Sequence, residues 1–175
     1  CRREPEGAGG ARALRRLADL RLVRNGAIAP VRQVVSLPKG RVAVVSELIV
    51  GADLAVVLGA RGGLTRDEAA RLLDDLGGAL AHLHERGMAH GDVAAANVIV
   101  STDGHPVLID LLGGALETGT GTSAAPEREA GAPASAAADV YSLAALLRQC
   151  AAGSPALAER LDRVLPDALD ADPES

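Results

Sequence analysis

The chain has 175 residues, a formal net charge of −5 at pH 7 and a pI near 5.3. This length allows one domain with a buried core, and the acidic balance excludes the basic surface that nucleic-acid binding requires. No apolar run reaches the ~20 residues that cross a membrane and no signal peptide is visible, so we expect a cytoplasmic chain without a membrane segment.

A helix and a hairpin are predicted in the first third of the chain. Leucines recur among arginines in 11–24, which is typical of an amphipathic helix. Two β-branched runs, 28–36 and 41–47, flank the turn-forming residues 37–40 and predict a β-hairpin. A short linker and helix are expected to follow in 51–58.

A second helix is predicted over 65–86. Thr65 and Glu68 have the spacing of a capping box, which satisfies the first free amide groups of a helix. Leucines then recur on one face of the pattern. Gly77 and Gly78 in its middle cost about 1 kcal/mol each in helix propensity. We therefore expect another backbone to pack closely against these two glycines.

The second half of the chain predicts a smaller hairpin, a loop and further helices. β-Branched residues in 98–100 and 107–109 predict the hairpin. Residues 111–136 are small and polar without a period, which indicates a loop. An apolar helix is predicted over 137–149, and 157–169 is an amphipathic stretch interrupted by a proline.

Four short motifs follow one another in this second half. Asn97 comes five residues after Asp92, and Asp110 ends the second predicted hairpin. The motifs are His90-Gly91-Asp92 with Asn97, the hairpin with Asp110, Ala125-Pro126-Glu127, and Asp139-Val140-Tyr141-Ser142-Leu143. Their order and intervals resemble the C-terminal lobe of a eukaryotic-type protein kinase, a family that includes bacterial serine/threonine kinases.

The resemblance implies an α+β fold with a mainly helical large lobe, two small β-hairpins and an incomplete small lobe. We expect residues 1–50 to form the partial small lobe, with the first helix and a hairpin that ends at the hinge. Residues 51–175 would form the large lobe, truncated at its C-terminal end. The first three strands of the small lobe have no counterpart in the sequence, so we expect the chain to be a fragment.

In this family ATP and Mg²⁺ are the cofactors, and the resemblance assigns roles to three residues. Asp92 would be the catalytic base that accepts the proton of the attacking hydroxyl, or the residue that orients that hydroxyl. Asn97 and Asp110 would bind Mg²⁺, which prefers oxygen ligands and completes its shell with phosphate oxygens. We expect the three side chains to converge within about one metal-coordination shell.

The same resemblance implies roles for five further residues. Glu47 and Ile49 lie in the expected hinge, where main-chain groups hold the adenine of the nucleotide. His90 would pack the catalytic loop, and Asp139 would hydrogen-bond the backbone of that loop from beneath. Glu127 would be a structural ion-pair partner.

Several family positions carry other residues in this chain. The only lysine, Lys39, lies in a hairpin turn and cannot grip the α- and β-phosphates. Arg15 and Arg16 stand at the centre of the first helix where a glutamate is expected, and Ala94 replaces a loop lysine. The motif that would bind the metal reads Asp110-Leu111-Leu112-Gly113, with its glycine displaced by one residue. We therefore expect weak or lost phosphoryl transfer, a pseudokinase whose partner is a protein substrate or a regulatory protein.

Gly91 takes the place of the arginine that precedes the catalytic aspartate in the family. That arginine belongs to the cationic pocket that binds a phosphate on the activation loop. We therefore expect no regulation by phosphorylation of Thr118, Thr120 or Thr122.

Two other functions stay open. His90-Gly91-Asp92 followed by Asn97 is also the signature of small-molecule phosphotransferases that act on aminoglycosides or choline. Those enzymes lack the Ala-Pro-Glu and Asp-Val-Tyr-Ser-Leu motifs, which counts against this function. The third possibility is a pure interaction module that binds a protein and no nucleotide.

The two cysteines, Cys1 and Cys150, stand outside any CxxC pattern. In a reducing cytosol we expect two free thiols, with a disulfide between them as the alternative.

Overall fold

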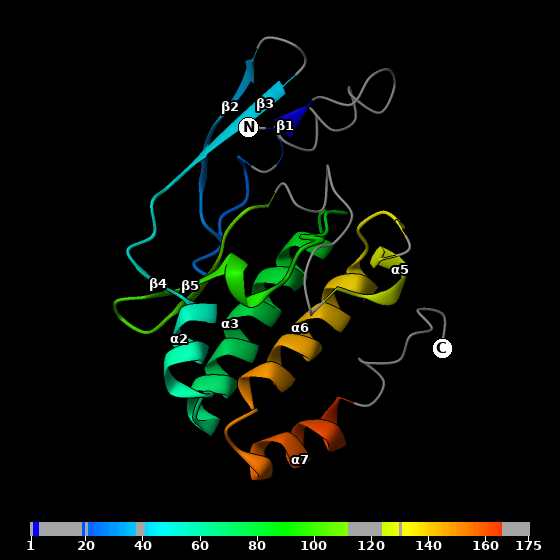
Figure 1. The fold of residues 1–175 in the computed structure, drawn as a ribbon. Coiled ribbons are helices and arrows are strands. Elements are labelled where there is room, and N and C mark those ends of the chain that lie inside the picture. Colours follow the sequence, from blue (N-terminus) through cyan, green and yellow to red (C-terminus); the bar gives the residue numbers. More distant parts are fainter. Residues whose placement is uncertain are drawn as a thin grey trace.

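The computed structural model describes residues 2–3, 19, 21–37, 41–111, 124–129 and 131–165. Within these ranges two small antiparallel sheets accompany a helical body, which confirms the predicted α+β class. No helix in the described ranges is long and apolar enough to cross a membrane. In chain order the elements are β1 (Arg2–Arg3), β2 (Val31–Leu37), β3 (Arg41–Ser46), β4 (Gly51–Asp53), α2 (Leu54–Arg61), α3 (Arg66–His84), the short 3-10 helix η1 (Ala95–Asn97), β5 (Val98–Ser101), β6 (Pro106–Leu108), α5 (Pro126–Glu129), α6 (Ala136–Cys150) and α7 (Pro155–Val164) (Figure 1).

The first sheet has the strand order β1-β3-β2. β2 and β3 form the predicted hairpin, in antiparallel register from Val31 opposite Ser46 to Leu37 opposite Arg41. The hairpin rises above the helical body in Figure 1. β1 adds a third strand beside β3 that the sequence did not predict, because two residues are too few to show a strand period.

The second sheet has the order β4-β5-β6 and contains the second predicted hairpin. β4 falls where the sequence predicted a linker and the start of a helix, and it pairs with β5 so that Gly51 lies opposite Ser101. A Cβ atom on Gly51 would lie 2.1 Å from the carbonyl oxygen of Val100, so this pairing requires glycine. Ala29 N donates to Leu108 O and Leu108 N to Ala27 O, which ties the segment before β2 to β6.

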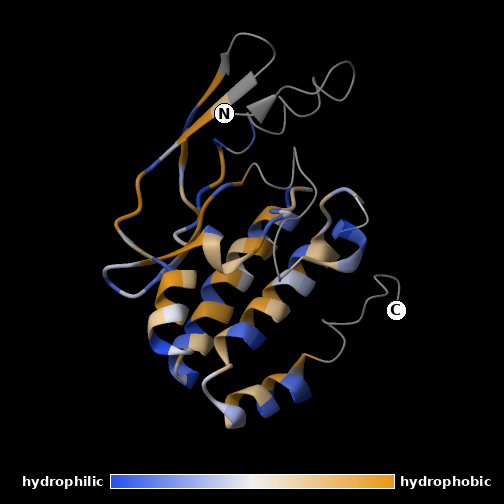
Figure 2. Cartoon of the chain, in the orientation of Figure 1, coloured by the Kyte–Doolittle hydropathy of each residue, from blue (hydrophilic) through white to orange (hydrophobic). Residues whose placement is uncertain are grey.

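Helices α3 and α6 lie side by side at the centre of the helical body (Figure 1). Leu76 and Leu83 of α3 and Leu146 and Leu147 of α6 are almost completely buried. Figure 2 shows hydrophobic residues running along α2, α3 and α6. Burial contributes roughly 1.5–3 kcal/mol for each leucine, so leucines stabilise a core that has no Phe or Trp. The prediction that these two helices form the buried centre is confirmed.

The predicted capping box is present at the start of α3. Glu68 N donates to Thr65 Oγ1 over 3.3 Å, and Thr65 N donates to Glu68 Oε2 over 2.8 Å. Hydrogen bonds from the Arg61 guanidinium and from the Thr65 amide lower the pKa of Glu68 to about 2. The carboxylate therefore stays charged and joins the end of α2 to the start of α3.

Two expectations about this part of the chain are wrong. A Cβ atom on Gly77 or Gly78 meets no atom within 4 Å outside the neighbouring backbone of its own helix, so no other backbone of the described residues packs there. The segment predicted as the loop 111–136 contains α5, whose four residues are too few to show a helical period in the sequence.

Several predicted features lie outside the residues that the structure describes. In the predicted helix 11–24, Asp19 is helical, Arg21 and Leu22 lie in a turn, and 11–18 are not described. The predicted stretch 157–169 is described as far as residue 165. The other features are Cys1, Arg15, Arg16, Lys39, Thr118, Thr120 and Thr122.

Candidate active site

Asp139 fixes the loop that follows α3. Ser135 caps α6 by accepting a hydrogen bond from Ala138 N, which places Asp139 in the first turn of the helix. The Asp139 side chain is 1% exposed and accepts hydrogen bonds from the amides of His90 and Gly91, each over 2.7 Å. His84 Nε2 contacts the same carboxylate at 2.9 Å. Three partners thus compensate a buried carboxylate, as burial of such a group requires.

His90 is completely buried and links two segments of the site. Its Nε2 lies 3.0 Å from Ile109 O, and its Nδ1 accepts a hydrogen bond from Asp92 N over 3.2 Å. Because an amide only donates and a carbonyl only accepts, the ring carries its hydrogen on Nε2 and is neutral. Burial lowers the pKa of His90 further than the negative charge of Asp139 raises it. The ring therefore holds the Asp92 amide and the end of β6 at a fixed separation.

Asp92 and Asn97 contact each other directly. Asn97 Nδ2 donates to both the carbonyl oxygen and the carboxylate Oδ2 of Asp92, each over 2.9 Å. Asn97 closes η1, and its own carbonyl accepts a hydrogen bond from Ile109 N. Since Asp92 engages the amide nitrogen, the side-chain oxygen Oδ1 is the Asn97 atom that can face a cation.

Asp110 follows Ile109, the residue that both His90 and Asn97 contact. Among the non-glycine residues that the structure describes, only Asp110 has a positive φ, at 57°. This left-handed conformation costs roughly 1–2 kcal/mol, and such costs concentrate at functional sites. Asp92, Asn97 and Asp110 therefore come from adjoining, hydrogen-bonded segments. That their side chains meet on one cation stays a prediction.

The donor set fits a magnesium ion that also binds phosphate. Across the described part of the chain there is no group of three His, Cys, Asp or Glu residues that could hold a metal. The predicted set, Asn97 and Asp110, has one amide and one carboxylate, fewer ligands than the six that Mg²⁺ takes. Phosphate oxygens and water would have to complete the shell, as they do for nucleotide-bound Mg²⁺.

Arg128 is a contact of the catalytic loop that the sequence did not indicate. The side chain is 3% exposed, and it donates to Gly91 O over 3.3 Å and to Ala132 O over 2.5 Å. Gly91 has φ 79°, a conformation that favours glycine. With Asp92, Val93 and Ser142, Arg128 lines a hollow too narrow for a water molecule. His84 was missed as well, because it contacts Asp139 across 55 residues of sequence.

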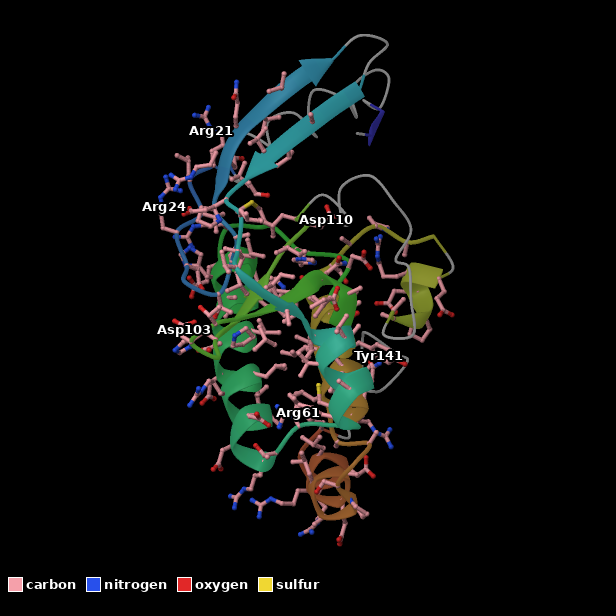
Figure 3. The ribbon with its side chains drawn as sticks, turned by 60° about the vertical axis from the view of Figure 1, so that its left-hand side comes forward. Arg21, Arg24, Arg61, Asp103, Asp110 and Tyr141 are labelled. Carbon is pink, nitrogen blue, oxygen red and sulfur yellow. The ribbon has the colours of Figure 1, made fainter. Side chains whose placement is uncertain are left out.

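The other predicted residues lie apart from this loop. The Glu47 carboxylate pairs with Arg32 at 2.6 Å, and the Glu47 amide donates to Pro30 O. Ile49 follows in the segment between β3 and β4 and lines a separate groove. Glu127 lies in α5, where its carbonyl accepts a hydrogen bond from Ala132 N. Figure 3 shows Asp110 below the β2–β3 hairpin, whereas Arg21, Arg24 and Asp103 lie along one edge of the molecule.

The helical body, the two small sheets and the loop 90–97 anchored to α6 form a kinase-like α+β fold. The family model described as "Protein kinase domain" matches residues 20–166. The chain belongs to the protein kinase family.

Bacterial serine/threonine kinases are among its relatives. It is 34% identical to serine/threonine-protein kinase PknE of Mycobacterium tuberculosis, over 66% of this chain and 22% of that protein. It is 36% identical to serine/threonine-protein kinase PkaA of Streptomyces coelicolor, over 65% of this chain and 23% of that protein. It is 32% identical to serine/threonine-protein kinase PknH of Mycobacterium bovis, over 62% of this chain and 20% of that protein. The chain thus spans about a fifth of the length of these relatives.

Proposed function

We propose that this chain is a degenerate serine/threonine protein kinase domain with weak or lost phosphoryl transfer and a scaffolding or regulatory role toward a protein partner. The observation that carries the proposal is a contrast within one loop. Asp139 and His90 hold its backbone in place, while Ala94 stands where the family has a loop lysine. These contacts hold the backbone of the loop, whereas the loop lacks the positively charged side chain that would contact the phosphates.

Asp92 is the proposed catalytic base, which accepts the proton of the attacking hydroxyl. Its amide is fixed by His90 and its carboxylate by Asn97. Asn97 Oδ1 and the Asp110 carboxylate are the proposed magnesium ligands. When bound, Mg²⁺ would supply charge neutralisation at the β- and γ-phosphates of ATP.

The remaining proposed roles concern the frame of the site. Main-chain groups of Glu47 and Ile49 would contact adenine. His90 and Asp139 are proposed to hold the loop, and Glu127 to take part in a structural ion pair. These roles need no particular chemistry beyond hydrogen bonding and charge, so they can persist where phosphoryl transfer is lost.

The direct test is transfer of radiolabelled phosphate from ATP by the 175-residue chain, to itself and to a generic protein substrate. We expect no measurable transfer, because each missing electrostatic contact to the phosphates costs several kcal/mol of barrier stabilisation. Transfer that disappears in Asp92→Ala and persists in Asp162→Ala, a change at the half-exposed surface of α7, would overturn the expected loss of transfer in this chain.

Titration with ATP and Mg²⁺ separates the alternatives. A degenerate kinase that keeps its hinge binds nucleotide without transferring phosphate. A pure interaction module binds none. Phosphate transfer to an aminoglycoside or to choline would instead identify a small-molecule phosphotransferase.

A further inference from the structure

A groove of about 580 Å³ lies on the side of α3 that faces the β5–β6 turn. Its lining comes from four separate segments: 25–27, Ile49, 74–78 of α3, and 101–107. No residue of the catalytic loop 90–97 lines it. The groove is therefore distinct from that loop, and it shares one residue, Ile49, with the proposed hinge.

The groove is lined by more acidic than basic side chains. Three carboxylates line it, those of Asp74, Asp75 and Asp103, and among the described lining residues there is no lysine or arginine. His105 contacts Asp75 at 3.0 Å and could offset at most one of the three charges when it is protonated. The apolar residues Ile49, Pro106 and Val107 line the same groove.

Two arginines lie near the groove but do not line it. Arg24 adjoins the groove residue Asn25, but its guanidinium donates to the carbonyls of Arg21 and Val23. Arg71 lies at the rim, with Nη1 3.6 Å from where a Cβ atom on Gly104 would stand. A cationic group entering the groove would meet more carboxylates than positive side chains among the described lining residues, and opposite charges attract at short range even in water.

Gly78 keeps the groove open. A glycine inside a helix costs about 1 kcal/mol, and the open space around Gly78 shows that packing does not require one there. Gly78 lines the groove, whereas the adjacent Gly77 does not. A long side chain at position 78 would occupy the space that the groove now offers.

We propose that this groove binds an extended basic segment of a partner protein, with arginine or lysine beside Asp74 and Asp103 and an apolar residue against Ile49 and Val107. The proposal rests on the proposed function only in that the partner is a protein. A lining drawn from four segments presents both apolar and acidic surface, which an extended chain with alternating side chains can match.

The test starts from displayed random 12-residue peptides selected on the immobilised chain, followed by anisotropy measurements with the enriched peptides. We expect enriched peptides to carry Arg or Lys within a few residues of Leu, Ile or Val. Their affinity should fall at least tenfold in Gly78→Gln and in the double variant with Asp74→Lys and Asp103→Lys. It should also weaken at high salt, because exposed charge pairs are screened.

Gly77→Gln is the matched control, since it makes the same change one residue away and outside the groove. It should bind the peptides within twofold of the unmodified chain, and circular dichroism should show both glutamine variants folded.

Four results would each overturn the proposal. They are enrichment without basic residues, equal loss in the Gly77 and Gly78 variants, equally tight binding of the polyamine spermidine, and self-association of the chain that Gly78→Gln abolishes. The assay reads binding and not phosphate transfer, so its failure leaves the proposed loss of transfer standing, and the reverse also holds.

Discussion

At the scale of single residues, Asp139 has the largest predicted effect on stability. Replacing it by alanine would leave the buried amides of His90 and Gly91 without their acceptor. Each unsatisfied buried donor costs about 1–3 kcal/mol, so Asp139→Ala should lower the free energy of unfolding by about 3 kcal/mol or more. Urea unfolding followed by circular dichroism measures this change.

The control for this prediction is Asp162→Ala on α7. Asp162 is half exposed and pairs with Arg148 at 3.0 Å on the surface. An exposed pair of this kind contributes less than ~1 kcal/mol. Similar losses in the two variants would show that the buried contacts of Asp139 have no special weight.

His90 predicts a pH dependence of stability. Its pKa is lowered in the folded chain because the ring is buried, so below about pH 6.5 the unfolded chain binds a proton that the folded chain does not. Stability from this group is complete above pH 6.5 and is lost as the pH falls toward the lowered pKa, with a slope of at most ~1.4 kcal/mol per pH unit.

His90→Gln tests this slope, because glutamine keeps one donor and one acceptor but does not titrate. We expect the free energy of unfolding of the unmodified chain to fall more steeply between pH 7.5 and pH 5 than that of the variant. Since both chains contain the other histidines, the difference isolates His90. If the free energies of unfolding of the two chains fall equally with pH, His90 is not held in its neutral form by burial.

At this scale the sequence predicted some contacts and missed others. The family motif placed Asp92 and Asn97 at a short interval, and a short interval is visible in a sequence. His84 meets Asp139 across 55 residues and Arg128 meets Gly91 across 37. No local pattern encodes such pairs, because folding alone brings them together.

At the scale of elements, two glycines predict opposite effects of the same substitution. Gly51→Ala would drive a methyl group into the carbonyl of Val100 and disturb the pairing of β4 with β5. We expect a loss of about 2 kcal/mol or more. Gly77→Ala meets open space inside α3 and should raise the free energy of unfolding by about 0.5–1 kcal/mol.

Thermal and urea unfolding of the two alanine variants, side by side, checks the signs. If both changes destabilise the chain, then a neighbour approaches Gly77 after all. If neither does, β4 tolerates a shift away from Val100.

Whether an element could be predicted depended on its length. Helix α3 and helix α6 repeat their apolar residues over several turns, and α3 begins with a recognisable cap. β1, β4 and α5 have two, three and four residues, too few for any period to emerge. Their positions are decided by partners elsewhere in the chain, such as Val100 opposite β4.

At the scale of the whole molecule, Cys150 reports on the opening of the core. The thiol is completely buried at the end of α6, and burial raises its pKa to about 12. Thiol reagents attack the thiolate, so Cys150 should react only when the structure opens. We expect a Cys1→Ser variant to react very slowly in buffer and at once in concentrated urea.

The reaction rate of that variant, measured as urea increases, should follow the global unfolding transition. A fast reaction in buffer alone, at the rate of a free thiol, would mean that α6 opens locally without unfolding of the core. In that case the leucine-rich contact between α3 and α6 is weaker than its burial indicates.

The hold of Asp139 on the catalytic loop has a consequence for the history of this chain. Asp139 touches the amide groups of residues 90 and 91, and every amino acid except proline offers that group. Substitutions along the loop, such as Ala94 and Gly91, therefore leave this anchor intact. Under the proposed loss of phosphoryl transfer, reactive side chains of the loop can be replaced one by one while its backbone stays anchored to α6.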